Sequence, residues 1–271
     1  MILITGDKGY LGSVLAPKLE EYKGWDYKDA RDISTINPRH LQEIDTIIHL
    51  AAIVGESACS KAPLDCYAIN AYATWRLTNL AWSLKIPKFV YASTCSIYGD
   101  TKGKIVSEDY PPKPWGYYSI SKFMAEFYVA TMGYTVARFG SLYGGQDGSS
   151  LPESFMRDAK EGRIDVRDPE AYRPLTHVED AANAILFLLE KNPPIAILNI
   201  VGENMSKGEL ASTIASRYEA HVVKHSTHPM VDRSYRVSSE GLLSLGFPVT
   251  IGPELIPSRS SLTGVHNGTF I

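Results

Sequence analysis

The chain has 271 residues, 44% of them hydrophobic and 21% charged, with a formal net charge of −3. These values are ordinary for a globular enzyme and give no sign of nucleic-acid or anionic-lipid binding. No apolar run approaches the roughly 18 residues of a membrane span, and we expect no secretory leader. The three cysteines form no C-x-x-C pair. We therefore expect no disulfide framework, no metal site and a reducing, cytoplasmic environment.

Short apolar runs alternate with helix-length segments along the first 200 residues. Buried strands are predicted over 2–4, 46–50, 88–93, 135–139 and 195–200, and helices over 11–22, 66–85 and 118–132. This alternation predicts an α/β fold, namely a Rossmann-type doubly wound parallel sheet with helices on both faces. Beyond residue 140 the pattern loosens into a small mixed C-terminal lobe. One helix start is clear there, because Ser206 and Glu209 have the spacing of a capping box.

A glycine-rich segment directly follows the first predicted strand. Gly6, Gly9 and Gly12 have the spacing G-x-x-G-x-x-G and stand before a predicted helix. Glycine permits a tight turn and a close approach of the backbone to a pyrophosphate, which the helix N-terminus attracts. A glycine turn without a ligand is the alternative, but the strand–turn–helix order favours a dinucleotide site.

A carboxylate about 20 residues beyond such glycines typically binds the ribose of NAD. Asp29 best fits the end of a second strand, and Asp26 is the alternative. Lys28 and Arg31 lie close by and could instead accept a 2′-phosphate, so NADP is not excluded. NAD is the predicted cofactor.

Tyr118 and Lys122 are four residues apart and share one face of a predicted helix. A phenol with a pKa near 10 is a poor base at neutral pH, but a neighbouring ammonium stabilises the phenolate. A second Y-x-x-x-K, from Tyr98 to Lys102, has a Gly-Asp interior that suits a turn. A hydroxyl-rich strand end over 93–96 precedes Tyr118, at the edge of the sheet where ligands bind in open α/β folds. These residues predict a proton-transfer centre.

In this order, the three motifs resemble the extended short-chain dehydrogenase/reductases, specifically the NAD-dependent epimerase/dehydratase family. The likeness covers roughly residues 1–190. Further motifs that carry it are H-L-A-A over 49–52, Asn70, the pair Asp32 and Ile33, R-F-G-S-L-Y-G over 138–144 and R-P-L-T-H-V-E-D over 173–180.

The resemblance implies a role for each matching position. Thr94, Tyr118 and Lys122 would be the catalytic set, with Tyr118 as the base. The substrate would contact Thr94, Ser141, Arg173 and either Arg233 or Arg236. The implied cofactor contacts are Gly6, Gly9, Tyr10, Leu11, Gly12, Asp29, Asp32, Ile33, Leu50, Ala51, Ala52, Asn70, Ser93, Tyr118 and Lys122.

Two positions depart from the family pattern. Ser141 stands where an asparagine usually touches the substrate diphosphate. Cys95 and Ser96 follow Thr94, where the 4,6-dehydratases carry an Asp-Glu pair, so dehydration is not expected. Cys95 is interpreted as a small buried side chain, with an acid/base role as the alternative.

The resemblance implies an NAD-dependent epimerase of a nucleotide-linked sugar, acting at C4 through a transient keto-sugar. The alternatives are an NAD(P)-dependent sugar or uronate dehydrogenase or keto-sugar reductase, and a non-catalytic dinucleotide-sensing protein. The expected domains are an NAD-binding Rossmann domain over 1–140 and 173–201, and a substrate-binding lobe over 141–172 and 202–271. Aromatic residues on the helices over 66–85 and 118–132 predict a homodimer, unless they are buried within one chain.

Overall fold

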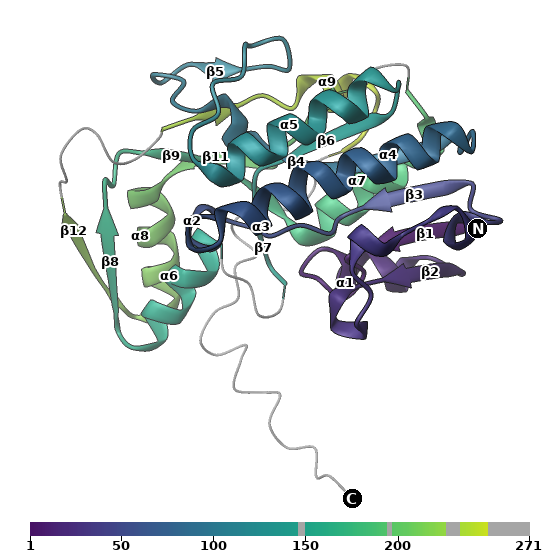
Figure 1. Cartoon of the computed structure of the whole chain (residues 1–271). Helices are drawn as coiled ribbons and strands as arrows, with labels where there is room; N and C mark the ends of the chain where they lie inside the picture. Colours follow the sequence, from purple (N-terminus) through teal and green to yellow (C-terminus); the bar gives the residue numbers. More distant parts are fainter. Residues whose placement is uncertain (146–149, 194–196, 226–233, 249–271) are drawn as a thin grey trace, which may run out of the picture.

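The computed structural model describes residues 1–145, 150–193, 197–225 and 234–248. A parallel sheet of six strands lies at its centre, in the order β10–β6–β4–β3–β1–β2 (Figure 1). The predicted Rossmann-type sheet is therefore confirmed. Its strands are β1 (Ile2–Thr5), β2 (Tyr22–Trp25), β3 (Thr46–His49), β4 (Lys88–Thr94), β6 (Thr135–Phe139) and β10 (Ile197–Ile200).

Helices cover both faces of this sheet because its strands bury side chains on both sides. Ile4 and Ile48 pack in the core beneath α1 (Gly12–Leu15) and α7 (Val178–Lys191). Leu3 and Ile47 point the other way, as alternation along a strand requires. That second face is covered by the π-helical segment η5 (Ala68–Ala73), α4 (Thr74–Ser83) and α5 (Tyr117–Thr131), and α2 (Glu56–Lys61) and α3 (Pro63–Tyr67) pack against α5.

A second core lies in what we call the α6–α8 lobe. It consists of α6 (Leu151–Lys160), β8 (Arg163–Arg167), α8 (Lys207–Tyr218) and β12 (His221–His225), which enclose Phe155, Ile164 and Ile214. The predicted capping box at the start of α8 is confirmed. The remaining described elements are β5 (Ile105–Val106), β7 (Ser141–Tyr143), β9 (Tyr172–His177), β11 (Glu203–Ser206), β13 (Arg236–Val237) and α9 (Glu240–Ser244).

The predicted helix over 11–22 is wrong in its length. α1 ends at Leu15 and only a 3-10 turn, Ala16–Lys18, continues it. Pro17 lacks a backbone N–H, and Leu19 is already extended, so the chain turns into β2. The predicted helix over 66–85 begins earlier instead, at Pro63, and runs through the π-helical segment to Ser83. No described helix is long and apolar enough to span a membrane.

Candidate active site

The glycine turn lies between β1 and α1, as predicted. Gly6 has a φ of +76°, and a Cβ added there would lie 2.8 Å from the Ala51 backbone nitrogen. A Cβ at Gly12 would collide with the backbone of Gly6 and Asp7. Both positions therefore require glycine, and Ala51, after β3, forms the facing wall of the turn. Gly9 closes the turn by donating its N–H to the Gly6 carbonyl over 3.0 Å.

Tyr10 and Leu11, the other two predicted residues of the turn, point in different directions. Leu11 is buried in the core beneath α7. The Tyr10 hydroxyl donates to the Glu153 carboxylate in the α6–α8 lobe. The helix that follows the turn is shorter than the sequence suggested, so any helix dipole acting on a phosphate is correspondingly weak.

Three carboxylates gather beside the glycine turn. Because β2 ends at Trp25, Asp26 and not Asp29 follows the strand directly, which corrects the predicted placement. Asp26 is 3% exposed and accepts hydrogen bonds from the backbone N–H groups of Lys8 and Lys28, over 3.2 and 2.8 Å. Asp29 lies further out and forms an ion pair with Lys8.

The third carboxylate, Asp7, is one that sequence reasoning missed. It is 7% exposed, and its Oδ1 has no hydrogen-bond partner within the described protein. Burial raises its pKa, and the charges of Asp26 and Asp29 raise it further. An orphaned buried acceptor beside a glycine turn fits a ligand with hydroxyl donors, and the ribose of NAD is such a ligand.

The segment after β3 is held in place by buried polar side chains. His49 joins Thr5 and Thr74 through hydrogen bonds of 2.6 and 2.8 Å, and burial lowers its pKa to about 3, so its ring is neutral. Asn70 bonds both the N–H and the carbonyl of Ile53, over 2.8 and 2.9 Å. These contacts position Leu50, Ala51 and Ala52, the predicted cofactor-lining residues, opposite the glycine turn.

Asp32 and Ile33 follow β2 but serve the fold in a way that the sequence did not suggest. Asp32 accepts the Ser34 N–H over 2.7 Å as the N-cap of a 3-10 turn, and its carbonyl accepts from the Trp25 indole. Ile33 is buried with Trp25 in the core. Their predicted contact with adenine stays a prediction.

The cysteine prediction is wrong for one pair. Cys59 and Cys66 form a disulfide across the junction of α2 and α3, with a Cα–Cα distance of 5.2 Å. An odd number of cysteines without a C-x-x-C pair predicts no disulfide framework, yet an odd number only requires that one cysteine stays free. That one is Cys95. Asn70 donates to the Cys66 sulfur over 3.3 Å, so the disulfide adjoins the cofactor-lining segment.

Thr94 and Tyr118 meet at the carboxyl end of β4, and Lys122 lies one turn further along α5, with its ammonium 4.3 Å from the centre of the Tyr91 ring on β4. Tyr118 and Lys122 occupy the first two turns of α5, and the Tyr118 side chain is hydrogen-bonded to Thr94. Burial raises the pKa of the Tyr118 phenol, whereas the bond with Thr94 acts to lower it. Burial lowers the pKa of Lys122 to about 7. The expected lowering of the phenol pKa by the Lys122 ammonium is therefore not found, because burial dominates and the only lowering influence comes from Thr94.

A buried ionic network supports this centre from behind, and the sequence did not reveal it. Glu126, one turn after Lys122, accepts from Ser93 and forms an ion pair of 2.8 Å with Arg138. Arg138 also donates to the Tyr98 hydroxyl over 2.8 Å. Ser93, a predicted cofactor contact, thus points its hydroxyl at Glu126. Tyr98 belongs to the second Y-x-x-x-K, which does form a turn rather than a helix.

A second unforeseen residue fixes the start of α5. Glu56, on α2, accepts the backbone N–H groups of Tyr117 and Tyr118 over 2.8 and 3.1 Å. Gly116 has a φ of +86°, which favours glycine before the helix, and a Cβ there would also displace this carboxylate. A negative charge at a helix N-terminus stabilises the helix. The capping box pattern could not reveal Glu56 because it lies about 60 residues upstream.

Two predicted substrate residues lie on strands next to the centre. Ser141 begins β7 and pairs with Leu175 of β9. Arg173, on β9, places its guanidinium 5.3 Å from the centre of the Tyr235 ring, and Tyr235 in turn acts electrostatically on Tyr118. Arg236, the alternative second arginine, stacks on the neighbouring ring of Tyr172 at 4.7 Å.

Two further predictions concern Arg233 and Cys95. Arg233 lies outside the described residues. Cys95 is fully buried, donates to the Arg138 carbonyl over 3.3 Å and has a pKa that burial raises. These contacts agree with a small buried side chain and leave no thiolate for acid/base chemistry.

Sequence comparison finds relatives that are named as enzymes of nucleotide-linked sugars. GDP-6-deoxy-D-talose 4-dehydrogenase of Aggregatibacter actinomycetemcomitans is 29% identical over 208 residues, 70% of each chain. A putative UDP-glucose 4-epimerase of Methanocaldococcus jannaschii is 26% identical over 253 residues, 79% of this chain and 81% of its own. Human dTDP-D-glucose 4,6-dehydratase is 24% identical over 297 residues, 91% of this chain and 84% of its own.

Solved structures share the fold over nearly the whole chain. MoeE5 in complex with UDP-glucuronic acid and NAD superimposes with a TM-score of 0.85 and 25% identity, covering 97% of this chain and 98% of its own. UDP-glucose 4-epimerase of Thermus thermophilus in complex with NAD gives a TM-score of 0.83 and 20% identity, covering 97% and 99%. The family model named NAD dependent epimerase/dehydratase family matches residues 2–200. The chain therefore belongs to the NAD-dependent epimerase/dehydratase family, whose members are enzymes.

Proposed function

We propose that the protein is an NAD-dependent epimerase of a nucleotide-linked sugar, acting at C4. The observation that carries this proposal is the hydrogen-bonded pair of Thr94 and Tyr118, followed by a buried Cys95 and by Ser96 rather than by carboxylates. Such a site can move a proton to and from a sugar hydroxyl. It offers no acid after Thr94 for removing water from the sugar.

The residues divide the chemistry as follows. Thr94 orients the sugar hydroxyl by hydrogen bonding, and Tyr118 accepts its proton once the phenol, whose pKa burial raises, has ionised. Lys122 supplies positive charge beside the phenolate when it is protonated. Bound NAD supplies the acceptor, and afterwards the donor, of the hydride. Glu56 fixes the start of α5, and Glu126 joins α5 to β4 through Ser93 and to β6 through Arg138, so the two hydroxyls keep their separation.

Nucleotide sugars offered to the purified protein with NAD test this proposal. UDP-glucose, UDP-galactose and their dTDP counterparts would be followed by stereochemistry at C4 and by nicotinamide absorbance. Interconversion without a net change in absorbance supports the epimerase. Formation of a 4-keto-6-deoxy sugar would contradict the proposal and identify a dehydratase.

A net dehydrogenase or reductase is the second candidate, and one comparison favours it specifically. The 29% identical relative is named as a 4-dehydrogenase of a GDP-linked deoxysugar. The same Thr94–Tyr118 pair would serve both the oxidation of a sugar hydroxyl and the reduction of a keto-sugar. Steady accumulation of NADH with a nucleotide sugar, or consumption of NADH or NADPH with its keto form, would select this candidate.

For the substrate, we propose that Arg173 binds the diphosphate, with Ser141 beside it. A guanidinium presents a fork of donors that matches phosphate oxygens. The Arg173 guanidinium lies against the Tyr235 ring, and Tyr235 is close enough to Tyr118 to raise the pKa of its phenol. Arg173→Lys should weaken UDP binding in a direct titration while NAD affinity stays unchanged.

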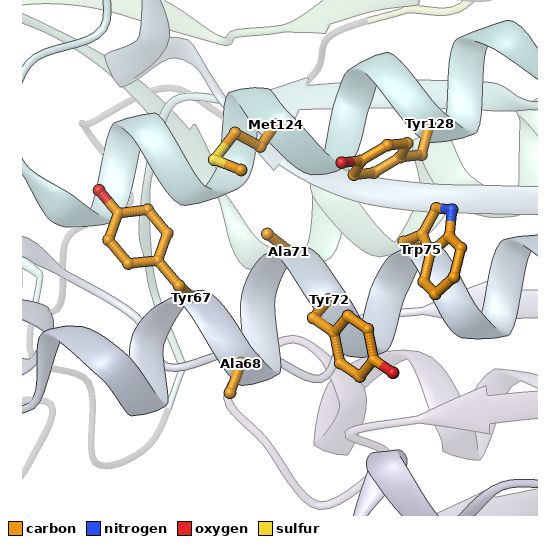
Figure 2. Close-up of a pocket in the computed structure, with 7 residues that line it drawn as sticks. All are labelled: Tyr67, Ala68, Ala71, Tyr72, Trp75, Met124 and Tyr128. Atoms are coloured by element: carbon orange, nitrogen blue, oxygen red, sulfur yellow. The ribbon is translucent and has the colours of Figure 1, made fainter.

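We also propose a homodimer through an aromatic face on α4 and α5. Trp82 and Phe127 are 59% and 67% exposed. Beside them is an apolar hollow of about 600 Å³ between η5, α4 and α5 (Figure 2), lined by Tyr67, Ala68, Ala71, Tyr72, Trp75, Met124 and Tyr128. Exposed apolar patches of this kind mark interfaces. Sedimentation should show a dimer at micromolar concentration, and Trp75→Glu should yield a monomer.

A further inference from the structure

The hydroxyl of Tyr10 joins the glycine turn to the α6–α8 lobe. The Tyr10 hydroxyl donates to Glu153 Oε1 over 2.6 Å and accepts the Gly145 N–H over 2.8 Å. The same carboxylate oxygen accepts the Gly144 N–H over 3.0 Å. Tyr10 belongs to the glycine turn, Gly144 and Gly145 to the segment after β7, and Glu153 to the first turn of α6. The glycine turn thus shares one junction with two segments that lie far from it in sequence.

The junction is tightly packed and carries charge. A Cβ at Gly145 would lie 2.7 Å from the Tyr10 ring, and a Cβ at Gly144 would collide with the His177 ring. The Tyr10 and His177 rings therefore leave no room for a side chain at Gly145 and Gly144, respectively. Burial raises the pKa of Tyr10, and Glu153 raises it further, so the phenol remains a donor throughout the neutral range. Hydrogen bonds that involve an ionised group are among the stronger ones.

We propose that Tyr10 and Glu153 are positioning residues. They couple cofactor binding to the ordering of the segment after β7 and of the first turn of α6, on the substrate side of the site. A dinucleotide that fixes the glycine turn also fixes the Tyr10 phenol. That phenol holds the segment after β7 and the first turn of α6. A ligand that binds there meets a surface already ordered, and the entropy lost on its binding is smaller. The coupling must be reciprocal.

The inference rests on the proposed function only for the identity of the second ligand. Its first test needs NAD alone. Hydrogen exchange is measured with and without NAD for the wild type, Tyr10→Phe, Glu153→Gln and Glu153→Ala. In the wild type, NAD should slow exchange both in the glycine turn and in α6. In Tyr10→Phe and Glu153→Ala, it should slow exchange in the turn only. Glu153→Gln keeps an acceptor without charge and should be intermediate.

The second test measures the coupling itself. The dissociation constant of UDP is determined by titration calorimetry with and without saturating NAD. For the wild type, we expect the dissociation constant of UDP to be about 5–150-fold higher without NAD than with it, the usual range for coupled sites. For Tyr10→Phe and Glu153→Ala, we expect the ratio of these two constants to be near one. Tyr27→Phe and Glu161→Gln, both at exposed positions, are the matched controls and should behave as the wild type. A merely structural role would lower affinities without changing this ratio.

The outcomes separate the two proposals. NAD-dependent slowing in α6 of the wild type, together with no binding of UDP or dTDP, would remove the nucleotide-sugar function and leave the junction standing. Equal slowing of α6 exchange in the wild type and in both Tyr10→Phe and Glu153→Ala would overturn the junction. So would the absence of any NAD effect on α6 in the wild type.

Discussion

The Lys122 ammonium lies 4.3 Å from the centre of the Tyr91 ring, beneath the carboxyl end of the central sheet. Lys122 is 3% exposed, and burial lowers its pKa to about 7 although Glu126 acts to raise it. A cation over a desolvated aromatic ring gains about 2 kcal/mol. The lowered pKa means that the hydration lost on burial outweighs the attraction of Glu126. The protonated form of Lys122 is therefore a destabilising charge.

Replacing Lys122 by Met should raise the free energy of unfolding by about 1–3 kcal/mol at pH 6. Below pH 7 the folded protein carries the buried charge in full. Between pH 7 and 10.5 the folded lysine is neutral while the unfolded lysine is still protonated, so the stability of the wild type rises with pH. The difference in the free energy of unfolding between Lys122→Met and the wild type should therefore be smaller at pH 9 than at pH 6. Urea unfolding at pH 6 and 9 measures this, with exposed Lys61→Met as control. A variant less stable at pH 6 would refute the argument.

Tyr118→Phe should lower kcat by about 10²–10⁴-fold, because the proton acceptor is lost while the ring still fills its place. Thr94→Val should lower it less, because the phenol remains. NAD affinity, read by titration, should change little in either variant. The neighbouring Tyr117, which is 42% exposed, provides the control variant Tyr117→Phe. Equal turnover by Tyr118→Phe and Tyr117→Phe would exclude the proposed base.

The sequence predictions that succeeded depend on the spacing of residues within one helix. Tyr118 and Lys122 share a helix face, and Ser206 and Glu209 share a helix start, so a few residues determine each geometry. Asp29 is favoured by the sequence because its distance from the glycines suits a carboxylate at the end of a second strand. β2 ends at Trp25 instead, since pairing with β1 covers only four residues.

Contacts between distant segments are what the sequence could not predict. The Glu56 cap joins α2 to α5, and Tyr10 reaches Glu153 only because the α6–α8 lobe folds back on the glycine turn. Asp7 looked like an ordinary loop residue until burial left its Oδ1 without a partner. Each of these residues is polar and inconspicuous in its own local pattern, and its role is set by tertiary packing alone.

The buried pair of Glu126 and Arg138 should be costly to break and less costly to remove. Arg138→Met leaves the Glu126 charge unpaired and should lower the free energy of unfolding by about 3–5 kcal/mol. The double variant Glu126→Met with Arg138→Met removes both charges and should be more stable than Arg138→Met alone. Urea unfolding of the single and double variants gives the coupling. Additive losses would show that the two side chains act independently.

Reducing the Cys59–Cys66 disulfide should lower the free energy of unfolding by about 2–3 kcal/mol, because a short loop is released in the unfolded chain. The two cysteines are separated by 7 positions in sequence. The Cys59→Ser, Cys66→Ser double variant should lose a similar amount and should no longer respond to dithiothreitol. Thermal unfolding with and without the reductant measures both. A wild type that is indifferent to reductant would mean that the disulfide contributes nothing to stability.

The variants Asp26→Asn and Asp29→Asn should differ in their affinity for NAD. Asp26 is buried at the end of β2, so its carboxylate can accept the ribose hydroxyls within a desolvated site. Asp26→Asn should weaken NAD binding by about 10–100-fold, the worth of hydrogen bonds to a charged group. Asp29 is partly exposed and already paired with Lys8, so Asp29→Asn should change affinity by less than about threefold. Removing the Asp26 charge should also narrow the preference for NAD over NADP, because repulsion of a 2′-phosphate falls. Fluorescence titration of the two dinucleotides against each variant tests these expectations, with the exposed Asp158→Asn as the control. A larger loss in Asp29→Asn than in Asp26→Asn would restore the prediction made from sequence.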